Sequence, residues 1–322
     1  MNNVTRRAVL AAMSSGFTLL GGSALAAASM RDRGFFDRHR LPIGIQLYSV
    51  GDDMRSHQDA TLGTLDAIGF QTVETAGFMG QTAAVFRQAL DRAGLKCASA
   101  HVAARPRGTD PGLSGDLGAL AADIHTLGAS HIVMPMPDIP ARLPPPPAAG
   151  QDFPAWVKSV FAEFTADDWK ANADFLNAKG KALKASGLQL AYHNHNMEFA
   201  PIGGSTGLEL LLSHTDPAYV QFEMDSGWVA ASGHDPLMLL RKHPGRFHLM
   251  HMKDIAKGSS PSFALAQSPA TIGSGSIDWH RLLPAAYAAG VRLFFIEHEP
   301  PYAQSPLETV RLDFNYLKNL SA

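Results

Sequence analysis

The feature of the sequence that most constrains the fold is an eightfold alternation of strand-like and helix-like segments. Short apolar runs are each followed by an amphipathic stretch. Several junctions carry a glycine, as in Ile68-Gly69-Phe70 and Ser186-Gly187-Leu188; there glycine accepts the left-handed conformation that ends a helix before a buried strand. The predicted strands are 43–48, 71–75, 95–100, 131–135, 188–193, 219–224, 247–252 and 292–297. The predicted helices are 59–68, 83–93, 117–127, 167–186, 207–213, 236–242, 279–289 and 306–320.

Eight strand–helix units in succession predict a single-domain α/β protein, a closed parallel (β/α)8 barrel over residues 41–322. A chain of 322 residues, 46% of them hydrophobic, is long enough for one such core. An open doubly wound sheet is the alternative. It is disfavoured because no glycine-rich phosphate loop follows the first predicted strand.

The N-terminal segment, residues 1–26, has the pattern of an export signal. Arg6 and Arg7 precede an apolar run at 9–20, and Ala24-Leu25-Ala26 supplies small residues for cleavage. This pattern predicts twin-arginine export to the periplasm, with an ordinary secretory signal as the alternative. The apolar run is short and rich in Gly and Ser, so we expect no stable membrane span after processing. Residues 27–40 are predicted to be a polar connector.

The longest irregular stretch is 136–164, which contains Pro144–Pro147. Because proline fixes φ and removes a donor, this stretch is predicted to be a loop after a strand and not a helix. Its position after a strand places it on the face where barrels bind ligands. A lid and a structural insertion both remain open.

The charge and the cysteine content of the chain limit the classes of partner and the disulfide bonds that can be expected. The formal net charge is −2 and no run of Lys or Arg forms a basic stripe, so nucleic acid is an improbable partner. The single cysteine, Cys97, lies in an apolar stretch and is predicted to be a core residue. The expected partner is a small molecule, and the sequence predicts no oligomeric state.

Ionisable side chains gather at the ends of the last four predicted strands, where barrel enzymes bind their ligands. Residues two apart on a strand share a face, so each strand presents its ionisable residues together. These residues are His193 and His195, Asp225, His251 and Lys253, and Glu297 and Glu299. Imidazole and carboxylate ligands without thiolate suit Mn²⁺, Zn²⁺, Fe²⁺, Co²⁺ or Mg²⁺. Such an ion can polarise a sugar carbonyl while a nearby base removes the adjacent proton.

Other polar and aromatic residues near this rim are candidates for supporting roles. Gln46, Glu74 and His101 are predicted to bind substrate hydroxyls, or else to be interior polar residues. Lys253 is predicted to be functional, with a salt bridge to an acid such as Glu223 as the alternative, and Asp254 is expected to brace the following loop. Trp228, Phe199 and Tyr302 could form an apolar wall or simply pack; Trp228 and Glu299 are the further predicted substrate contacts.

Three stretches, 184–199 (KASGLQLAYHNHNMEF), 245–254 (GRFHLMHMKD) and 273–279 (GSGSIDW), carry a resemblance to a known family. The chain resembles the xylose-isomerase-like TIM barrel family, commonly called sugar phosphate isomerase/epimerase. The resemblance implies a metal bound by Glu, Asp, His and Glu on strands five to eight. Asp225, His251 and Glu297 match the last three.

Strand five departs from this implied pattern. His193 stands where many relatives have Glu, and the fourth ligand could be His193, His195 or Glu198, with His193 favoured. In epimerases of the family that Glu also transfers a proton, and Trp228 occupies a position where they often carry His. Both differences bear on the reaction outcome.

The resulting expectation is a metal-dependent isomerase or epimerase that removes a proton next to a carbonyl, with His195, Lys253 and Glu198 as catalytic candidates. Predicted export and the lack of a phosphate-binding cluster indicate a non-phosphorylated sugar. A 3-keto-glycoside lyase, which shares the first step, is the runner-up. A non-catalytic periplasmic sugar-binding protein is the alternative from another class, and a DNA-repair endonuclease is improbable for an exported acidic chain.

Overall fold

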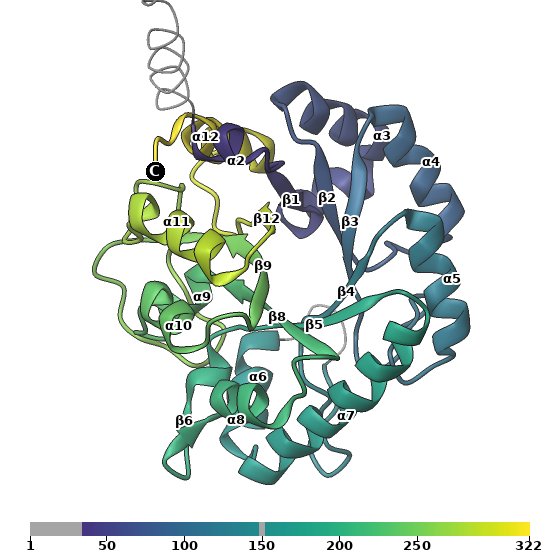
Figure 1. Cartoon of the computed structure of the whole chain (residues 1–322), viewed down its shortest axis with the longest axis vertical. Helices are drawn as coiled ribbons and strands as arrows, with labels where there is room; N and C mark the ends of the chain where they lie inside the picture. Colours follow the sequence, from purple (N-terminus) through teal and green to yellow (C-terminus); the bar gives the residue numbers. More distant parts are fainter. Residues whose placement is uncertain (1–33, 148–151) are drawn as a thin grey trace, which may run out of the picture.

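The computed structural model describes residues 34–147 and 152–322, and the chain forms a closed barrel of eight parallel strands (Figure 1). The strands are β1 (Gly44–Gln46), β2 (Thr72–Ala76), β3 (Lys96–His101), β4 (His131–Met134), β5 (Gln189–His193), β8 (Val220–Asp225), β9 (Phe247–Met252) and β12 (Leu293–Ile296). They are ordered β1-β12-β9-β8-β5-β4-β3-β2, so the barrel prediction is confirmed and the open-sheet alternative is wrong. The predicted export signal lies outside the described residues.

Helices surround the barrel, one after each strand in the predicted alternation (Figure 1). They are α3 (Gly51–Ile68), α4 (Ala83–Ala93), α5 (Leu117–Leu127), α7 (Ala166–Ala185), α8 (Gly207–His214), α10 (Pro236–Lys242), α11 (Trp279–Ala289) and α12 (Pro306–Asn319). The largest difference from the prediction is α3, which begins at Gly51 and not at 59. Its first turns are separated from the rest by non-helical dihedral angles at His57, just before the predicted start.

The stretch 136–164 holds a helix that the sequence interpretation excluded. Helix α6 (Phe153–Ala162) begins where the Asp152 side chain accepts a hydrogen bond from Ala155 N, with Pro154 in the first turn. Proline is favourable there, because the first helical N–H groups have no helical partner. The proline argument therefore holds for Pro144–Pro147, which are not helical, and is wrong for the residues after them.

The described end of the predicted connector also contains a helix, α2 (Phe35–His39). Phe35 and Phe36 are buried, and both rings contact Phe294 of β12 edge to face. A five-residue helix has too little periodicity to be detected in the sequence, whereas two adjacent aromatic residues were a usable sign of burial.

Inward-facing residues form layers within the barrel, and this layering positions the site. An apolar cluster of Val133, Ala191, Leu249 and Phe295 fills one level. Because side chains alternate along a strand, the next inward residue on three of these strands is ionisable. Those residues are His193, His251 and Glu297.

Shorter elements complete the structure. They are α9 (Ser226–Ala231), the 3-10 turns η1 (Leu47–Val50) and η2 (Met197–Phe199), and the two-stranded pairs β6 (Pro201–Ile202) with β7 (Ser205–Thr206) and β10 (Asp254–Ile255) with β11 (Pro269–Ala270). Cys97 is buried in the core, as predicted. Within the part of the chain that the structure describes, no helix combines the length and apolarity needed to cross a bilayer.

Candidate metal centre

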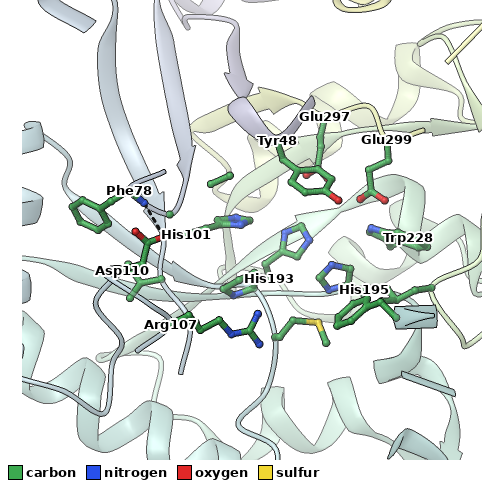
Figure 2. Close-up of a pocket in the computed structure, with 18 of the residues that line it drawn as sticks. Tyr48, Phe78, His101, Arg107, Asp110, His193, His195, Trp228, Glu297 and Glu299 are labelled. Carbon is green, nitrogen blue, oxygen red and sulfur yellow. Dashed lines mark hydrogen bonds between the residues drawn. The ribbon is translucent and has the colours of Figure 1, made fainter. Parts of the chain in front are cut away.

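A cavity of about 570 Å³ opens among the strand ends (Figure 2). One side is ionisable and the other is largely apolar. His101, His193, His195, Glu297 and Glu299 are on the ionisable side; the other side includes the apolar Phe78, Val102, Pro111, Met136 and Phe153, together with Arg107 and Asp110. A concave site with convergent polar groups on one side is the usual form of a small-molecule site.

Four side chains, which we call the outer group, lie beside this cavity: His193, Asp225, His251 and Glu297. Each offers a donor atom, and these atoms all lie within 4.8 Å of one another. Strand pairing explains the proximity, because Asp225 and His251 are register partners on β8 and β9. His251 Nδ1 lies 3.1 Å from Glu297 Oε2 and 3.8 Å from Asp225 Oδ2. The structure thus brings together the four predicted ligands, while their role as ligands stays a prediction.

Lys253 neutralises part of the outer group. Its ammonium Nζ lies 3.1 Å from Asp225 Oδ2, 2.7 Å from Glu297 Oε2 and 2.6 Å from Glu299 Oε1. Burial lowers the pKa of Lys253, but these three carboxylates outweigh burial and raise it well above the usual value. Lys253 is buried and does not line the cavity, and its partners are not Glu223, the acid suggested by the sequence.

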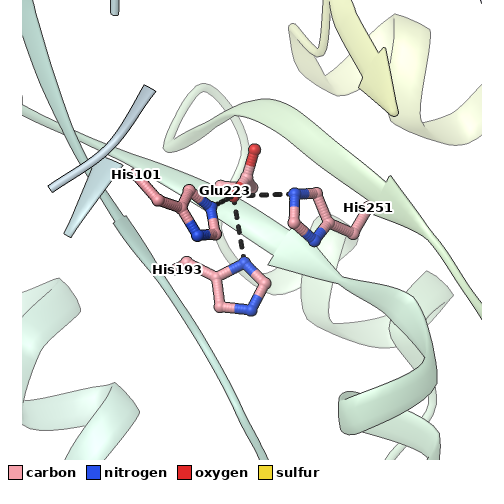
Figure 3. A group of neighbouring side chains, drawn as sticks. All are labelled: His101, His193, Glu223 and His251. Atoms are coloured by element: carbon pink, nitrogen blue, oxygen red, sulfur yellow. Dashed lines mark hydrogen bonds and ion pairs between the residues drawn. The ribbon is translucent and has the colours of Figure 1, made fainter. Parts of the chain in front are cut away.

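A second set of side chains, which we call the inner group, lies behind the first: Glu74, His101 and Glu223. Figure 3 shows His101, His193 and His251 around Glu223, with nitrogen atoms 3.2, 3.0 and 3.2 Å from its Oε2. Glu74 Oε1 lies 2.6 Å from His251 Nε2 and 2.9 Å from His101 Nε2. Glu223 had no assigned site role in the sequence interpretation. Its position two residues before Asp225, on the same face of β8, was the available signal.

Electrostatics indicate a strong preference for positive charge between these groups. Burial lowers the pKa of His251, but Glu223, Glu297 and Glu74 outweigh burial and raise it well above the usual value. Burial likewise opposes the charged form of His101, yet Glu74 and Glu223 raise its pKa to about 9. Burial, followed by the charge of Glu74, raises the pKa of Glu223 to about 7. Carboxylates that retain protons on imidazoles this strongly would also attract a divalent cation.

The outer group fits a metal ion on its donor chemistry. It combines imidazole and carboxylate donors, which suit first-row divalent metals and Mg²⁺. Asp225 Oδ2 is buried and accepts no well-aligned hydrogen bond among the described residues, although Lys253 Nζ is near. An unsatisfied buried carboxylate oxygen is costly unless it has a ligand to bind.

The comparisons with known proteins agree with the barrel. Residues 63–320 match the model of the family described as "Xylose isomerase-like TIM barrel". The chain belongs to this family. Its relatives include an inosose dehydratase from Bacillus anthracis, 37% identical over 92 residues, which are 29% of this chain and 30% of that protein. The matched segment thus spans only about a third of this curated relative.

Solved structures in the same fold extend the comparison. A sugar phosphate isomerase/epimerase from Parabacteroides distasonis ATCC 8503 is similar with a TM-score of 0.64 and 25% identity, covering 85% of this chain and 96% of that one. The IOLI protein, whose structure is described with a binding zinc atom, has a TM-score of 0.53 and 12% identity, covering 86% and 97%. The second likeness, at this identity, supports the fold alone.

Within this xylose isomerase-like barrel, the catalytic candidate His195 lines the cavity and contacts Trp228, with 5.6 Å between ring centroids. Burial, and then the charge of Lys253, lowers the pKa of His195 to about 3, so the ring is neutral near pH 7. Its Nδ1 is buried and has no hydrogen-bond partner among the described residues.

Glu198, another catalytic candidate, is placed differently. It is fully buried and outside the cavity lining, and it accepts hydrogen bonds from Tyr192 Oη at 2.7 Å and His195 N at 2.9 Å. Burial raises its pKa to about 7 despite these bonds. This position suits a role in holding the segment after β5.

The predicted substrate contacts divide into two sets. His101, Trp228 and Glu299 line the cavity, whereas Gln46 and Glu74 are fully buried behind it. Gln46 Nε2 donates to Glu74 Oε1 at 2.8 Å, which fits the interior position that the sequence left open, and contact of these two residues with a substrate stays a prediction. The sequence could not show whether these two residues lie at the rim or just below it, because predicted strand ends are uncertain by a residue or two.

Several other residues near the cavity differ in position from what the sequence suggested. Tyr48 and Arg107 line the cavity and were not identified as site residues. Tyr48 ends the predicted strand 43–48 but lies in the 3-10 turn η1, and Arg107 lies in the loop after β3. Phe199 and Tyr302 are not among the lining residues, so the suggested apolar wall retains only Trp228. Asp254 accepts bonds from Gly273 N at 3.0 Å and Trp279 Nε1 at 2.9 Å, as expected for a brace.

Proposed function

We propose that this barrel is a lyase that removes a proton next to the carbonyl of a non-phosphorylated sugar or cyclitol derivative and then expels a β-leaving group. The observation that carries the proposal is the outer group, whose two imidazoles and two carboxylates converge beside a cavity of substrate size. His193, Asp225, His251 and Glu297 would hold a divalent cation. That cation would polarise the carbonyl as a Lewis acid and so lower the pKa of the C–H group on the adjacent carbon.

The proton-transfer groups are assigned from their positions. His195, whose neutral ring lines the cavity, is the proposed base. Glu299 lines the same cavity, and burial raises its pKa, so it can protonate the leaving oxygen as the carbon–oxygen bond breaks. Figure 2 shows His195, Trp228 and Glu299 at one end of the cavity. Lys253, bonded to Glu299 and 4.8 Å from the Trp228 ring centroid, holds this end together.

Elimination is favoured over epimerisation for two reasons. Epimerisation returns the proton to the opposite face and so requires a second proton-transfer group, whereas His193 here replaces the implied strand-five Glu and faces Glu223. In addition, the curated relatives are named inosose dehydratase, and a dehydration is an elimination of water. This likeness covers 29% of the chain, so it supports elimination without carrying the proposal.

The substrate is proposed to lack phosphate. Arg107 is the one Lys or Arg among the lining residues of the described chain. We also propose, from residues 1–26, that the protein is exported to the periplasm. Export would favour a substrate without phosphate, since phosphorylated sugars are chiefly cytoplasmic.

Isomerisation or epimerisation remains the second candidate, favoured by the name of the similar Parabacteroides distasonis structure. Metal-loaded protein should be mixed separately with a 3-keto-glucoside, a keto-cyclitol and free ketoses, and the products followed by NMR. The proposal predicts aglycone or unsaturated product from the oxidised substrates only. Interconversion of free ketoses without elimination would establish the second candidate. Saturable binding with no turnover of any substrate would favour a sugar-binding protein.

A further inference from the structure

We infer that Glu223 and Glu74 are positioning residues that act through His193 and His251, each fixing which ring nitrogen its histidine presents to the metal centre. The inference rests on the metal centre of the proposed function. It assigns a role to two buried carboxylates that meet no substrate, because neither residue lines the cavity.

The first pair joins neighbouring strands. His193 and Glu223 are register partners on β5 and β8, and His193 Nδ1 lies 3.0 Å from Glu223 Oε2. A neutral imidazole has one N–H group, and a carboxylate can only accept, so Glu223 holds that proton on Nδ1. The lone pair is then on Nε2, which makes no hydrogen bond within the described chain. His193 lines the cavity, so this free nitrogen is the one available to a cation.

The second pair repeats the arrangement across the barrel. His251 Nε2 lies 2.6 Å from Glu74 Oε1, and its Nδ1 lies 3.1 Å from Glu297 Oε2. With a cation on the Nδ1 side, the ring proton would stay on Nε2, where Glu74 accepts it. The other nitrogen, Nδ1, faces the carboxylates of Glu297 and Asp225 in the outer group. Glu74 is itself held by Gln46 and by a hydrogen bond from Ser99 Oγ, so its orientation is fixed. Carboxylates that orient metal-binding histidines in this way also raise the basicity of the ligand.

No lysine or arginine of the described chain explains the burial of the inner carboxylates. Among the residues that the structure describes, no Lys or Arg lies within 4 Å of Glu74 or Glu223, in contrast to Asp225 and Glu297. Their charged partners are imidazoles, with His101 lying between the two. Burying a carboxylate is costly, and here each one contacts a histidine of the outer group.

The test measures metal affinity, which a purely structural role would not move. Co²⁺ titration of metal-free protein, followed by visible absorption and chelator competition, gives the affinity and the stoichiometry. Glu223→Gln and Glu74→Gln are each expected to weaken Co²⁺ binding about 10- to 100-fold. Asp313→Asn is the matched control, because Asp313 is an equally buried carboxylate 3.5 Å from His298 and outside the cavity lining. Its affinity should equal that of the wild type.

A double-mutant cycle tests whether each carboxylate acts through its histidine. His193→Asn with Glu223→Gln should bind Co²⁺ no more weakly than His193→Asn alone. Glu74 contacts His251 and His101 but not His193, so Glu74→Gln should add its effect to that of His193→Asn. If one variant fails to fold by circular dichroism, the Glu74–His251 cycle gives the same decision. Unchanged affinity in both Gln variants, full additivity in both cycles, or a second Co²⁺ lost on removing Glu223 would overturn the inference. A wild-type protein that binds no Co²⁺ would instead overturn the proposed function.

Discussion

The two sides of the cavity are built differently. The ionisable side comes from the ends of β5, β8, β9 and β12, where residues such as His193 and Asp225 are held by strand register and are almost fully buried. The apolar side comes from segments that follow β2, β3 and β4, including Phe78, Met136 and the start of α6. In barrels, strands fix catalytic groups while the following loops vary. We therefore expect the first side to determine the chemistry and the second side to determine substrate selection.

The largest effect should come from the ionisable side. Asp225→Asn keeps an N-cap for α9, because an Asn side chain can also accept from Trp228 N as Asp225 Oδ1 does at 2.8 Å. It removes a charge from the outer group, so we expect metal content and turnover to fall together by more than about 100-fold. Elemental analysis and initial rates on the same sample measure both. Full metal content in the variant would contradict the expectation that the ionisable side of the cavity determines the chemistry.

Lys253→Met should affect folding stability. The substitution leaves Asp225, Glu297 and Glu299 without their ammonium partner, and breaking a buried ion pair from one side costs about 3–5 kcal/mol of unfolding free energy. Urea denaturation of metal-free protein measures the change. Lys242→Met is the control, because Lys242 is 62% exposed in its pair with Glu209 and should cost less than about 1 kcal/mol. Equal losses in the two variants would contradict the account.

The apolar side should show a smaller and more selective effect. Phe153 lines the cavity at the start of α6 and stacks on Trp156 with 5.2 Å between centroids. Phe153→Ala should raise KM about tenfold for a keto-glycoside with an apolar aglycone and leave kcat unchanged. A small keto-cyclitol should be turned over as by the wild type. A fall in kcat for both substrates would show that this side also takes part in the chemistry.

The smallest effect is a pH dependence of stability near the ionisable side. Because burial raises the pKa of Glu198 to about 7, the folded state binds its proton more tightly than the unfolded chain does. The stabilisation from this proton is complete below the unfolded pKa, near 4.5, and is lost as pH rises through about 7. The stability of the wild type relative to Glu198→Gln should thus decrease from pH 5 to pH 8. Urea midpoints of both proteins at the two pH values test this; a constant difference would contradict it.

The same two sides differ in how far the sequence predicted them. Alternation along a strand was enough to place His193, His251 and Glu297 together, because strand period and barrel geometry leave little freedom. The cavity wall at Phe153 was missed, since Pro144–Pro147 led to the interpretation of the whole stretch 136–164 as a loop. For Gln46 and Glu74 the sequence left both a rim position and an interior position open, and both residues are fully buried. The level of a polar residue in the barrel depends on the tilt of the strands and on the register between them. Neither can be read from a single sequence.

Deuterium exchange tests the central claim most directly, namely that the outer group holds a metal ion used to remove a proton next to a carbonyl. The protein, metal-loaded or chelator-treated, is incubated in D2O with a keto-cyclitol or a 3-keto-glucoside and followed by proton NMR. We predict that the signal of the proton beside the carbonyl is lost, by exchange or by elimination, only with the metal-loaded protein, and that Asp225→Asn abolishes the effect. An equal rate after chelation, or no loss of the signal with either substrate, would contradict the claim.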